Sequence, residues 1–529
     1  MASKNQKITL HVPDIQVTLY KMIVRDSAAG LTGTTPGANL SSAVANAIAP
    51  LTSQPAIGST KLFAMDEGID LTPFLGEVGG VRVTKSIREG AGAFQITFAD
   101  KPYVSARGVD SVYALIEPQD MLEIRFRHNI PSGQTRQSDA QTVSPGAKPP
   151  ILMRAFVSGV RRDQVVGSDG KPQRTVTVRG LDYGKILKML QIKYLPGYVV
   201  GEDYLSAFRL FERFGVGFQT SMKASDFVTQ VITDVVNPFL QNMMPASSTK
   251  PKAIQVDASV QNGVVDVSGS QNQEGSVYEL LKFYGDVGVW NELYVESRED
   301  GEHLVYRPSP IKDLNGVPIQ VGAPYLAPVQ IPANDIIDLS AERTDDGVAN
   351  YFWCSSPRWE MVDDNTGRLW AMTQGDRSTV DLSTYQNSAL SLYGLRPMQV
   401  QTNQGGNDVT TLTSGQDAAT QSARSDSMVN WIVGRRAGLA AQNRDNVLFE
   451  SGTARIRANE DVRPGCFVEL WQGDVSTVAY CSRVDFDFVF GVGMFQTLTL
   501  ERGDGFIQRM ANSGQGTTTS RYYSEMIRR

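Results

Sequence analysis

Strands with one apolar and one polar face are predicted near both ends of the chain. Apolar and polar residues alternate over 81–83, 94–98 and 122–127, and again over 484–490. Because successive side chains of a strand point to opposite faces, each run offers one face to a core and the other to water. The opposite face of the last run carries Asp485 and Asp487. We expect the apolar faces to form barrel cores that include Phe94, Ile96, Phe98, Val484, Phe486 and Phe488.

The middle of the chain, from 191 to 335, has a different pattern in which helices are mixed with short strands. The apolar spacing predicts helices over 225–240 and 276–287. Ser276 followed three residues later by Glu279 is the signature of a capping box at a helix start. A polar helical segment is also predicted at 416–443. The chain is therefore expected to be mainly β with an α+β middle.

Composition places the chain among ordinary globular proteins. Its 529 residues suggest three to four domains at about 150 residues each. Fifty basic residues against 56 acidic ones argue against broad wrapping of nucleic acid. Apolar runs stay well short of the ~18 residues that span a bilayer, and the start lacks the apolar segment of a secretory signal. We expect a soluble product that is made inside a cell and has no membrane contact.

The cysteines are Cys354, Cys466 and Cys481. An odd number without a Cys-x-x-Cys spacing does not suggest a disulfide framework or a zinc site. Free, mostly buried thiols in a reducing compartment are the favoured interpretation. A disulfide between Cys466 and Cys481 is the alternative.

Candidate catalytic groups are sparse. The histidines, His11, His128 and His303, lie in unrelated segments, and none has a second histidine at the spacing of a metal site. The carboxylate pairs at 345–346 and 363–364 are adjacent in sequence. On a strand their side chains point to opposite faces, so neither pair forms a natural acid–base couple. We therefore expect no enzyme, no metal and no cofactor.

One short motif, G-x-G-x-F-Q, occurs at 90–95 and again at 491–496. Each copy opens an alternating strand, and duplication of a β-barrel would explain the repeat. Four identities over six positions also arise by chance. Dinucleotide binding is not predicted, because that glycine motif requires a following helix rather than a strand.

Longer stretches form an ordered series of degenerate motifs between about residues 75 and 505. The first group is the Gly-x-Phe strand at 90–98 with IEPQDMLEIRF, ILMRAFVSGVRRD and RTVTVRGLDYGKIL. The second is SVYELLKFYGDVGVWNELYVESREDGEHLVYRPSP, IIDLSAERTDDGVANYFWCSSP, SALSLYGLRPMQV, VRPGCFVELW and YCSRVDFDFVFGVGMFQTLTLERGDG. In this order they resemble the baseplate hub, or tail hub, of contractile-tailed bacteriophages. A long small-residue stretch at 27–60 and Asp485 depart from the family pattern.

The resemblance implies an architecture. Such hubs are homotrimers in which each chain holds two similar antiparallel β-barrels, so that three chains present a ring of six barrels. The expected domains are a first β-barrel domain at 1–190 with an arm inserted at about 27–60, and an α+β middle domain at 191–335. They are followed by a second β-barrel domain at 336–510, which contains the helical segment 416–443, and by a C-terminal tail at 511–529.

The implied function is structural. A trimeric ring in the virion tail baseplate, made in the host cytoplasm, would adapt the sixfold tail tube to the threefold central spike and contact other baseplate proteins. Viral DNA would pass through the lumen without specific binding. Asp485 and Asp487 are the expected lumen-facing residues, because like charge prevents sticking to phosphates. The alternatives are a tail-associated cell-wall hydrolase and a glycan-binding adhesin that uses Trp353, Trp359 and Trp370.

Overall fold

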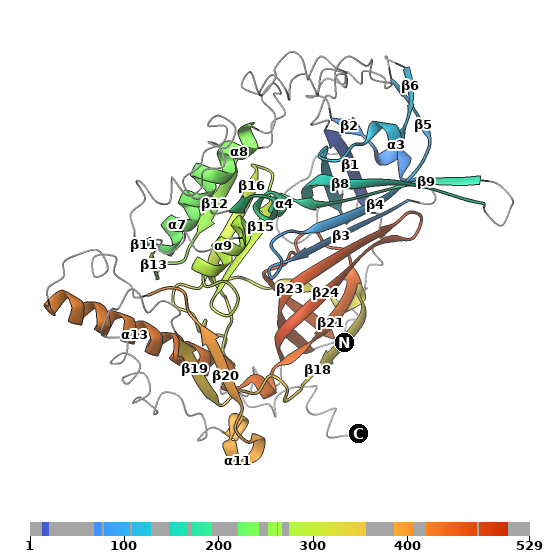
Figure 1. The fold of residues 1–529 in the computed structure, drawn as a ribbon. Coiled ribbons are helices and arrows are strands. Elements are labelled where there is room, and N and C mark those ends of the chain that lie inside the picture. Colours follow the sequence, from blue (N-terminus) through green and yellow to red (C-terminus); the bar gives the residue numbers. More distant parts are fainter. Residues whose placement is uncertain are drawn as a thin grey trace, which may run out of the picture.

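The computed structural model describes residues 13–20, 68–76, 79–105, 108–128, 148–166, 172–192, 221–242, 252–261, 263–266, 275–355, 386–405, 418–472 and 475–505 (Figure 1). Its largest element is a mainly antiparallel sheet of 13 strands that draws on both ends of the chain. In Figure 1 the blue strands from the start lie beside the red strands from the end, and the green helices and strands of the middle lie to one side.

Six strands form what we call the first unit. They are ordered β3-β4-β9-β8-β7-β1 in the sheet. Their bounds are β1 (Asp14–Tyr20), β3 (Gly80–Ser86), β4 (Ala93–Ala99), β7 (Met121–Arg127), β8 (Ile151–Val166) and β9 (Pro172–Asp182). The two-residue β2 (Ile69–Asp70) extends this unit beyond β1.

Six later strands form the second unit, ordered β18-β21-β24-β23-β22-β17. Their bounds are β17 (Val329–Ile331), β18 (Ile336–Glu342), β21 (Glu450–Arg457), β22 (Cys466–Gln472), β23 (Val475–Val489) and β24 (Gly493–Gly505). If the strands of each unit are numbered along the chain, both units have the spatial order 1-4-5-6-3-2. The units differ at their first strand, because β1 pairs antiparallel with β7 whereas β17 pairs parallel with β22.

A bulge at the same place in both units supports this equivalence. In the β8–β9 hairpin the register shifts at Ser158, between the pairs that Val157 and Gly159 make with β9. In the β23–β24 hairpin it shifts in the same way at Ser482, between Cys481 and Arg483. Bulges change the twist and direction of a strand, so a shared bulge is a structural feature and not only a shared strand order.

The G-x-G-x-F-Q motif is not the trace of this repeat. Its two copies open β4 and β24, which take different places in their units, since the counterpart of β24 is β9. Phe94 is buried, whereas Phe495 lies on the other face of its strand and is half-exposed. A shift of one residue against the pleat moves every side chain to the opposite face. The same motif residues therefore lie on the core face in one strand and on the polar face in the other.

The middle of the chain forms a separate core beside the first unit. A three-stranded sheet of β12 (Ile254–Ala258), β16 (Glu302–Pro308) and β15 (Asn291–Ser297) carries α7 (Ala224–Val231), a π-helix (Ile232–Val236) and α8 (Asn237–Asn242). Helix α9 (Val277–Tyr284) begins at the predicted capping box. The Ser276 hydroxyl accepts from the Glu279 amide, and the Glu279 carboxylate accepts from the Ser276 amide. This prediction is confirmed.

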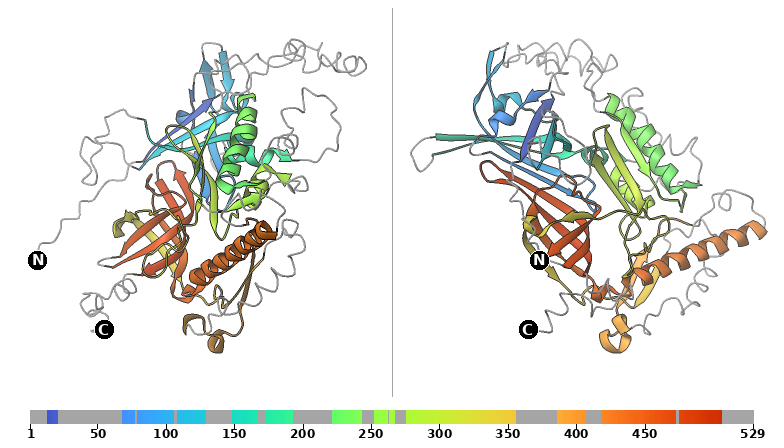
Figure 2. Two further views of the ribbon diagram at one scale, coloured as in Figure 1. Left: turned by 90° about the vertical axis from the view of Figure 1, so that its left-hand side faces the viewer. Right: turned by 180° about the vertical axis from the view of Figure 1, so that it is seen from behind.

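The segment between β18 and β21 packs away from the large sheet. It contains β19 (Tyr351–Ser355), β20 (Pro397–Gln401), α11 (Leu390–Tyr393) and the long α13 (Ala418–Asn443), which extends outward in Figure 2. Ile432 and Leu439 of α13 pack with Phe352 and with Trp290 of the middle. The remaining named elements are α3 (Val112–Leu115), α4 (Gly184–Met189), β5 (Pro102–Ser105), β6 (Gly108–Ser111), β10 (Gln191–Ile192), β11 (Ser221–Lys223), β13 (Val264–Asp266), β14 (Gly275–Ser276) and short 3-10 turns at 72–74, 333–335, 386–388 and 446–448.

Candidate assembly surface

The two units meet edge to edge within the chain. Strand β23 of the second unit pairs antiparallel with β3 of the first, from Arg483 opposite Ser86 to Val489 opposite Gly80. Only the second half of β23 takes part, because β22 occupies that edge along the first half. The sheet therefore runs from one unit into the other through backbone hydrogen bonds.

The predicted core residues lie beneath this junction. Phe126 of the first unit and Phe486 of the second meet edge to face with ring centroids 6.4 Å apart. A single apolar cluster includes residues of both units, so one continuous core supports the junction. That cluster contains all six of the predicted positions, namely Phe94, Ile96, Phe98, Val484, Phe486 and Phe488.

Asp485 and Asp487 lie on the opposite, polar face of the sheet, and both have cationic or hydroxyl neighbours. Asp485 accepts a hydrogen bond from the Thr84 hydroxyl at 2.5 Å and two from the Arg483 guanidinium at 3.0 and 3.1 Å. Asp487 lies directly opposite Arg82, with 3.9 Å between the charged groups. Each carboxylate is therefore balanced by an arginine, and neither stands as a bare negative charge.

The rest of this polar face is rich in threonine and arginine. Cross-strand neighbours form rows across the units, such as Arg457–Phe495–Asp487–Arg82–Gln95. The outward-facing residues of the described strands β3, β4, β9, β21, β23 and β24 include Arg82, Arg179, Arg455, Arg457 and Arg483, together with Asp485, Asp487 and Glu501. On these strands the face is therefore mixed in charge and not purely acidic.

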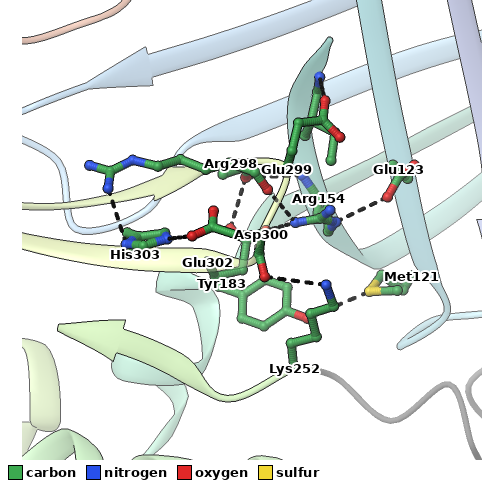
Figure 3. A network of polar contacts seen from close by, with 12 residues as sticks. Met121, Glu123, Arg154, Tyr183, Lys252, Arg298, Glu299, Asp300, Glu302 and His303 are labelled. Atoms are coloured by element: carbon green, nitrogen blue, oxygen red, sulfur yellow. Dashed lines mark hydrogen bonds and ion pairs between the residues drawn. The ribbon is translucent and has the colours of Figure 1, made fainter. Parts of the chain in front are cut away.

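A buried ionic network joins the first unit to the middle sheet (Figure 3). Arg154 on β8 donates to Glu123 of β7 and to Glu302 of β16, both at 3.0 Å. Glu302 also accepts from the Ser297 hydroxyl at 2.8 Å. Burial raises the pKa of Glu302 to about 7, although the nearby Lys85 and Arg154 oppose that shift. A buried guanidinium shared by two carboxylates fixes the geometry of the elements that carry them.

A second network joins the same middle sheet to the second unit. Arg307 of β16 donates to Glu292 of β15 at 2.9 Å and to the Gly465 carbonyl at 2.7 Å. The Tyr480 hydroxyl of β23 donates to Glu292 at 2.5 Å. Strands β15 and β16 are thus fastened to both units, which adds to the β23–β3 pairing in setting their relative position.

The histidines that the structure describes lie within hydrogen-bonding distance of carboxylates. His128 lies 2.6 Å from Glu460 and so links the end of β7 to the second unit. Burial alone would raise the pKa of Glu460, but the hydrogen bond and charge of His128 hold it at about 2. His303 lies 3.1–3.2 Å from Asp257 and Asp300 on the middle sheet. Among the described residues, no group of three His, Cys, Asp or Glu side chains is placed to hold a metal ion.

The three cysteines are free thiols. Cys466 and Cys481 lie directly opposite each other on β22 and β23, and burial raises the pKa of both thiols. In the part of the chain that the structure describes, no helix has the length and apolar character needed to cross a membrane. The remaining residues singled out from the sequence, namely His11, Trp359, Trp370, the 363–364 pair, the 27–60 arm and the 511–529 tail, lie outside the described residues.

One sequence pattern follows the structural equivalence of the two units, and the motif analysis missed it. Residues 156–163 read FVSGVRRD and residues 480–487 read YCSRVDFD, which share an aromatic-x-Ser-x-Val-x-x-Asp pattern. The shared serine is the bulged residue in both hairpins. The two runs can be aligned on this serine once the bulges are known, and the alignment then matches β8 with β23.

Comparison with known proteins yields similarity at the level of structure only. Neither a family model nor a curated protein sequence matches the chain. A tail protein from Neisseria meningitidis MC58 is similar with a TM-score of 0.41 at 12% identity, covering 80% of this chain and 91% of that one. The 43 kDa tail protein of prophage MuSo2 from Shewanella oneidensis has a TM-score of 0.42 at 9% identity, covering 82% and 94%.

A third solved structure is the E. coli c3393 protein, described as a component of the type VI secretion system with structural similarity to the T4 bacteriophage tail proteins gp27 and gp5. Its TM-score is 0.33 at 6% identity, covering 80% of this chain and 72% of that one. These neighbours are tail proteins and a secretion component.

Proposed function

We propose that this chain is a structural protein of a phage tail, the hub of its baseplate, and that three copies form a ring. The observation that supports this proposal is the internal duplication, in which two units share one strand order and one bulge position. Three chains with two similar units each offer six similar surfaces around a threefold axis. Such a ring can match a sixfold partner on one side and a threefold partner on the other.

In this proposal the sixfold partner is the tail tube and the threefold partner is the central spike. Each six-stranded unit takes the role of one barrel, the first within a domain at 1–190 and the second within a domain at 336–510 that its strand β17 (Val329–Ile331) precedes. The domain at 191–335 contacts the spike or other baseplate proteins. The tail 511–529 has no role assigned. The protein resides in the virion after synthesis in the host cytoplasm, and needs no cofactor or membrane.

The polar face of the large sheet is proposed to line the channel through which DNA leaves. Asp485 and Asp487 then face the lumen together with the threonines and arginines of neighbouring strands. Because each carboxylate is paired with a hydroxyl or an arginine, the lining would be mixed in charge rather than purely repulsive. DNA passes along it without specific binding.

The native mass of the purified chain tests the proposal directly. Light scattering is expected to give about 173 kDa, the mass of three chains of 57.8 kDa. A dimer would overturn the ring, since no symmetry match to a sixfold tube follows from it. The adhesin alternative gains no specific observation, because only Trp353 of its three tryptophans lies within the described residues. The hydrolase alternative gains none either, since the described carboxylate pair at 345–346 lies in an exposed turn.

A further inference from the structure

The second half of β8 is an open strand edge in the described structure. On the side facing β7, its pairing ends near Val157, whose amide donates to Asp120 and whose carbonyl accepts from Gln119, both at 2.8 Å. From there to Val166 the described pairing of β8 is with β9 alone. In β23, the corresponding half-strand has the same position beyond β22, and there β3 covers it.

Exposure differs accordingly between the two equivalent half-strands. The bulge serine of β23, Ser482, is 2% exposed, whereas Ser158 at the same place in β8 is exposed. Val484 is fully buried, and its counterpart Val160 is only half-buried. Near the end of β8, Val165 is 64% exposed. The first unit therefore exposes the edge that the second unit has covered.

The strand equivalent to β3 is itself uncovered. In the second unit this strand is β18, which pairs with β21 and ends the sheet in the described structure. Its residues range from half-buried to exposed, whereas Val81, Val83 and Lys85 of β3 are buried. One chain thus has two uncovered strand edges, the second half of β8 on the first unit and β18 on the second unit. These edges are equivalent to the two that pair at the internal junction, β23 and β3.

We infer that β18 of one copy pairs antiparallel with the second half of β8 of the next copy, and that this contact joins the copies of the ring. This inference rests on the proposed function and names its interface. The contact repeats between chains the β23–β3 pairing found within the chain. A pairing of two different edges is heterologous, so it propagates from copy to copy and covers both of these edges in every copy when the ring closes.

The internal junction also supplies the register. Asp487 and Arg82 are directly opposed in the internal junction. Counting from the shared bulge, Asp163 is the equivalent of Asp487, and Ser340 is the equivalent of Arg82. Asp163 of one copy therefore lies opposite Ser340 of the next. Two residues along each strand, Arg161 then lies opposite Glu342.

One pair of charges fits this register, because Arg161 of β8 lies opposite Glu342 of β18. The Arg162 guanidinium is already paired with Asp100 at 2.9 Å and takes no part. Opposite charges directly across an antiparallel pair are favourable, and like charges are not. Within the chain Arg161 contacts only its neighbour Asp163 in the hydrogen bonds described, and its side chain is 79% exposed. It is free to turn toward an acidic strand.

Cysteine cross-linking tests the pairing on the full chain. Directly opposed residues of antiparallel strands bring their Cα atoms to about 4.5–5.5 Å, within the range of a disulfide. The variant Asp163→Cys/Ser340→Cys is expected to oxidise to covalent dimers and trimers. The matched control is Asp163→Cys/Ala341→Cys, in which the second cysteine is one residue along and faces the other side. We expect at least about fivefold less cross-linked product from the control.

The outcomes separate the interface from the oligomer. A light-scattering trimer in which both double variants cross-link equally poorly would overturn the β8–β18 pairing and leave the trimeric hub standing. A ladder of covalent species that continues beyond three chains would overturn the closed ring. A chain that stays monomeric would overturn the proposed function and this inference together.

A charge exchange provides a second measurement that does not depend on oxidation. Arg161→Glu is expected to raise the concentration needed for trimer formation by about five- to tenfold, because the substituted carboxylate would face the carboxylate of Glu342. The exchange Arg161→Glu/Glu342→Arg is expected to restore the trimer. Thermal unfolding of the separated monomers serves as the fold control. Failure of the exchange to restore assembly would overturn the register.

Discussion

Two phenylalanines that share a sequence motif are expected to differ sharply in their contribution to stability. Phe94 and Phe495 occupy the same place in G-x-G-x-F-Q, yet Phe94 is 3% exposed in the apolar core and Phe495 lies on the polar face. The perturbation is alanine at each position in turn. Because residue type and motif are the same, the comparison measures the effect of which face of the strand the side chain occupies.

The magnitudes follow from burial. Removing a buried phenylalanine ring costs its transfer free energy and leaves a cavity, about 3–5 kcal/mol in total. Phe495 contacts the guanidinium of Arg455, with 5.1 Å from the ring centroid, and keeps solvent access. An exposed cation–π contact contributes about 0.5–1 kcal/mol. Phe94→Ala is therefore expected to lose at least about three times as much unfolding free energy as Phe495→Ala.

The adjacent glutamines provide a matched pair in which the burial is reversed, since here the residue of the second motif copy is the buried one. Gln496 is fully buried; it accepts from the Asn459 amide at 3.0 Å and donates to the Asn459 carbonyl at 2.8 Å. Gln496→Ala leaves both backbone groups without this partner, at a cost of about 1–3 kcal/mol. Gln95 is exposed, and its replacement by alanine is expected to change stability by less than about 0.5 kcal/mol.

Urea unfolding followed by tryptophan fluorescence and by circular dichroism measures all four variants under one protocol. An unchanged slope with denaturant would show that the same amount of surface is exposed on unfolding in each variant. Equal losses for the two phenylalanines would refute the assignment of opposite faces. A larger loss for Gln95 than for Gln496 would refute it independently.

Three further predictions concern buried charge. Asp in place of Phe486 or of Phe94 puts a carboxylate into a site 1% or 3% exposed and is expected to abolish assembly; a normal native mass for both variants would remove these strands from the core. Burial raises the pKa of Glu302 from 4.5 to about 7, so between these pH values the folded protein binds a proton that the unfolded chain releases. The free energy of unfolding should therefore fall by up to about 3 kcal/mol as the pH rises from about 4.5 to above 7. Glu302→Gln is expected to remove that slope in urea titrations, and an unchanged slope would contradict the assignment. Glu460 is the reverse case, because burial opposes its ionisation but His128 lowers its pKa to about 2. Its contribution of about 3 kcal/mol to the free energy of unfolding should be lost as the pH falls from about 4.5 to 2. Glu460→Gln should flatten the pH dependence of acid unfolding in that range.

The faces of single strands could be predicted from the sequence because their cause is local. A strand alternates its side chains with a period of two, so the run around Phe94 and the run around Phe486 predicted which residues point inward, whatever strands lie beside them. The capping box at Ser276 was equally local, since its two hydrogen bonds join residues three apart. Both kinds of signal rest on covalent geometry and near neighbours.

The partners of each strand were decided by tertiary structure. The pairing of Asp485 with Thr84 joins residues 401 positions apart, and no periodicity in either strand specifies it. That long-range pairing also changed the meaning of the acidic face, because it set Asp487 opposite Arg82. Charge balance depends on which strands are neighbours, and neighbours are selected by the packing of the whole core.

The repeat shows the boundary between the two kinds of information. A motif of six residues matched β4 with β24, although the strand order matches β9 with β24. The weaker pattern around Ser158 and Ser482 carried the true correspondence, because a bulge constrains both backbone and register. Sequence by itself determined how each strand presents its two faces. Only the tertiary structure decided which strands are equivalent and which edges remain open, because these depend on hydrogen bonds between distant segments.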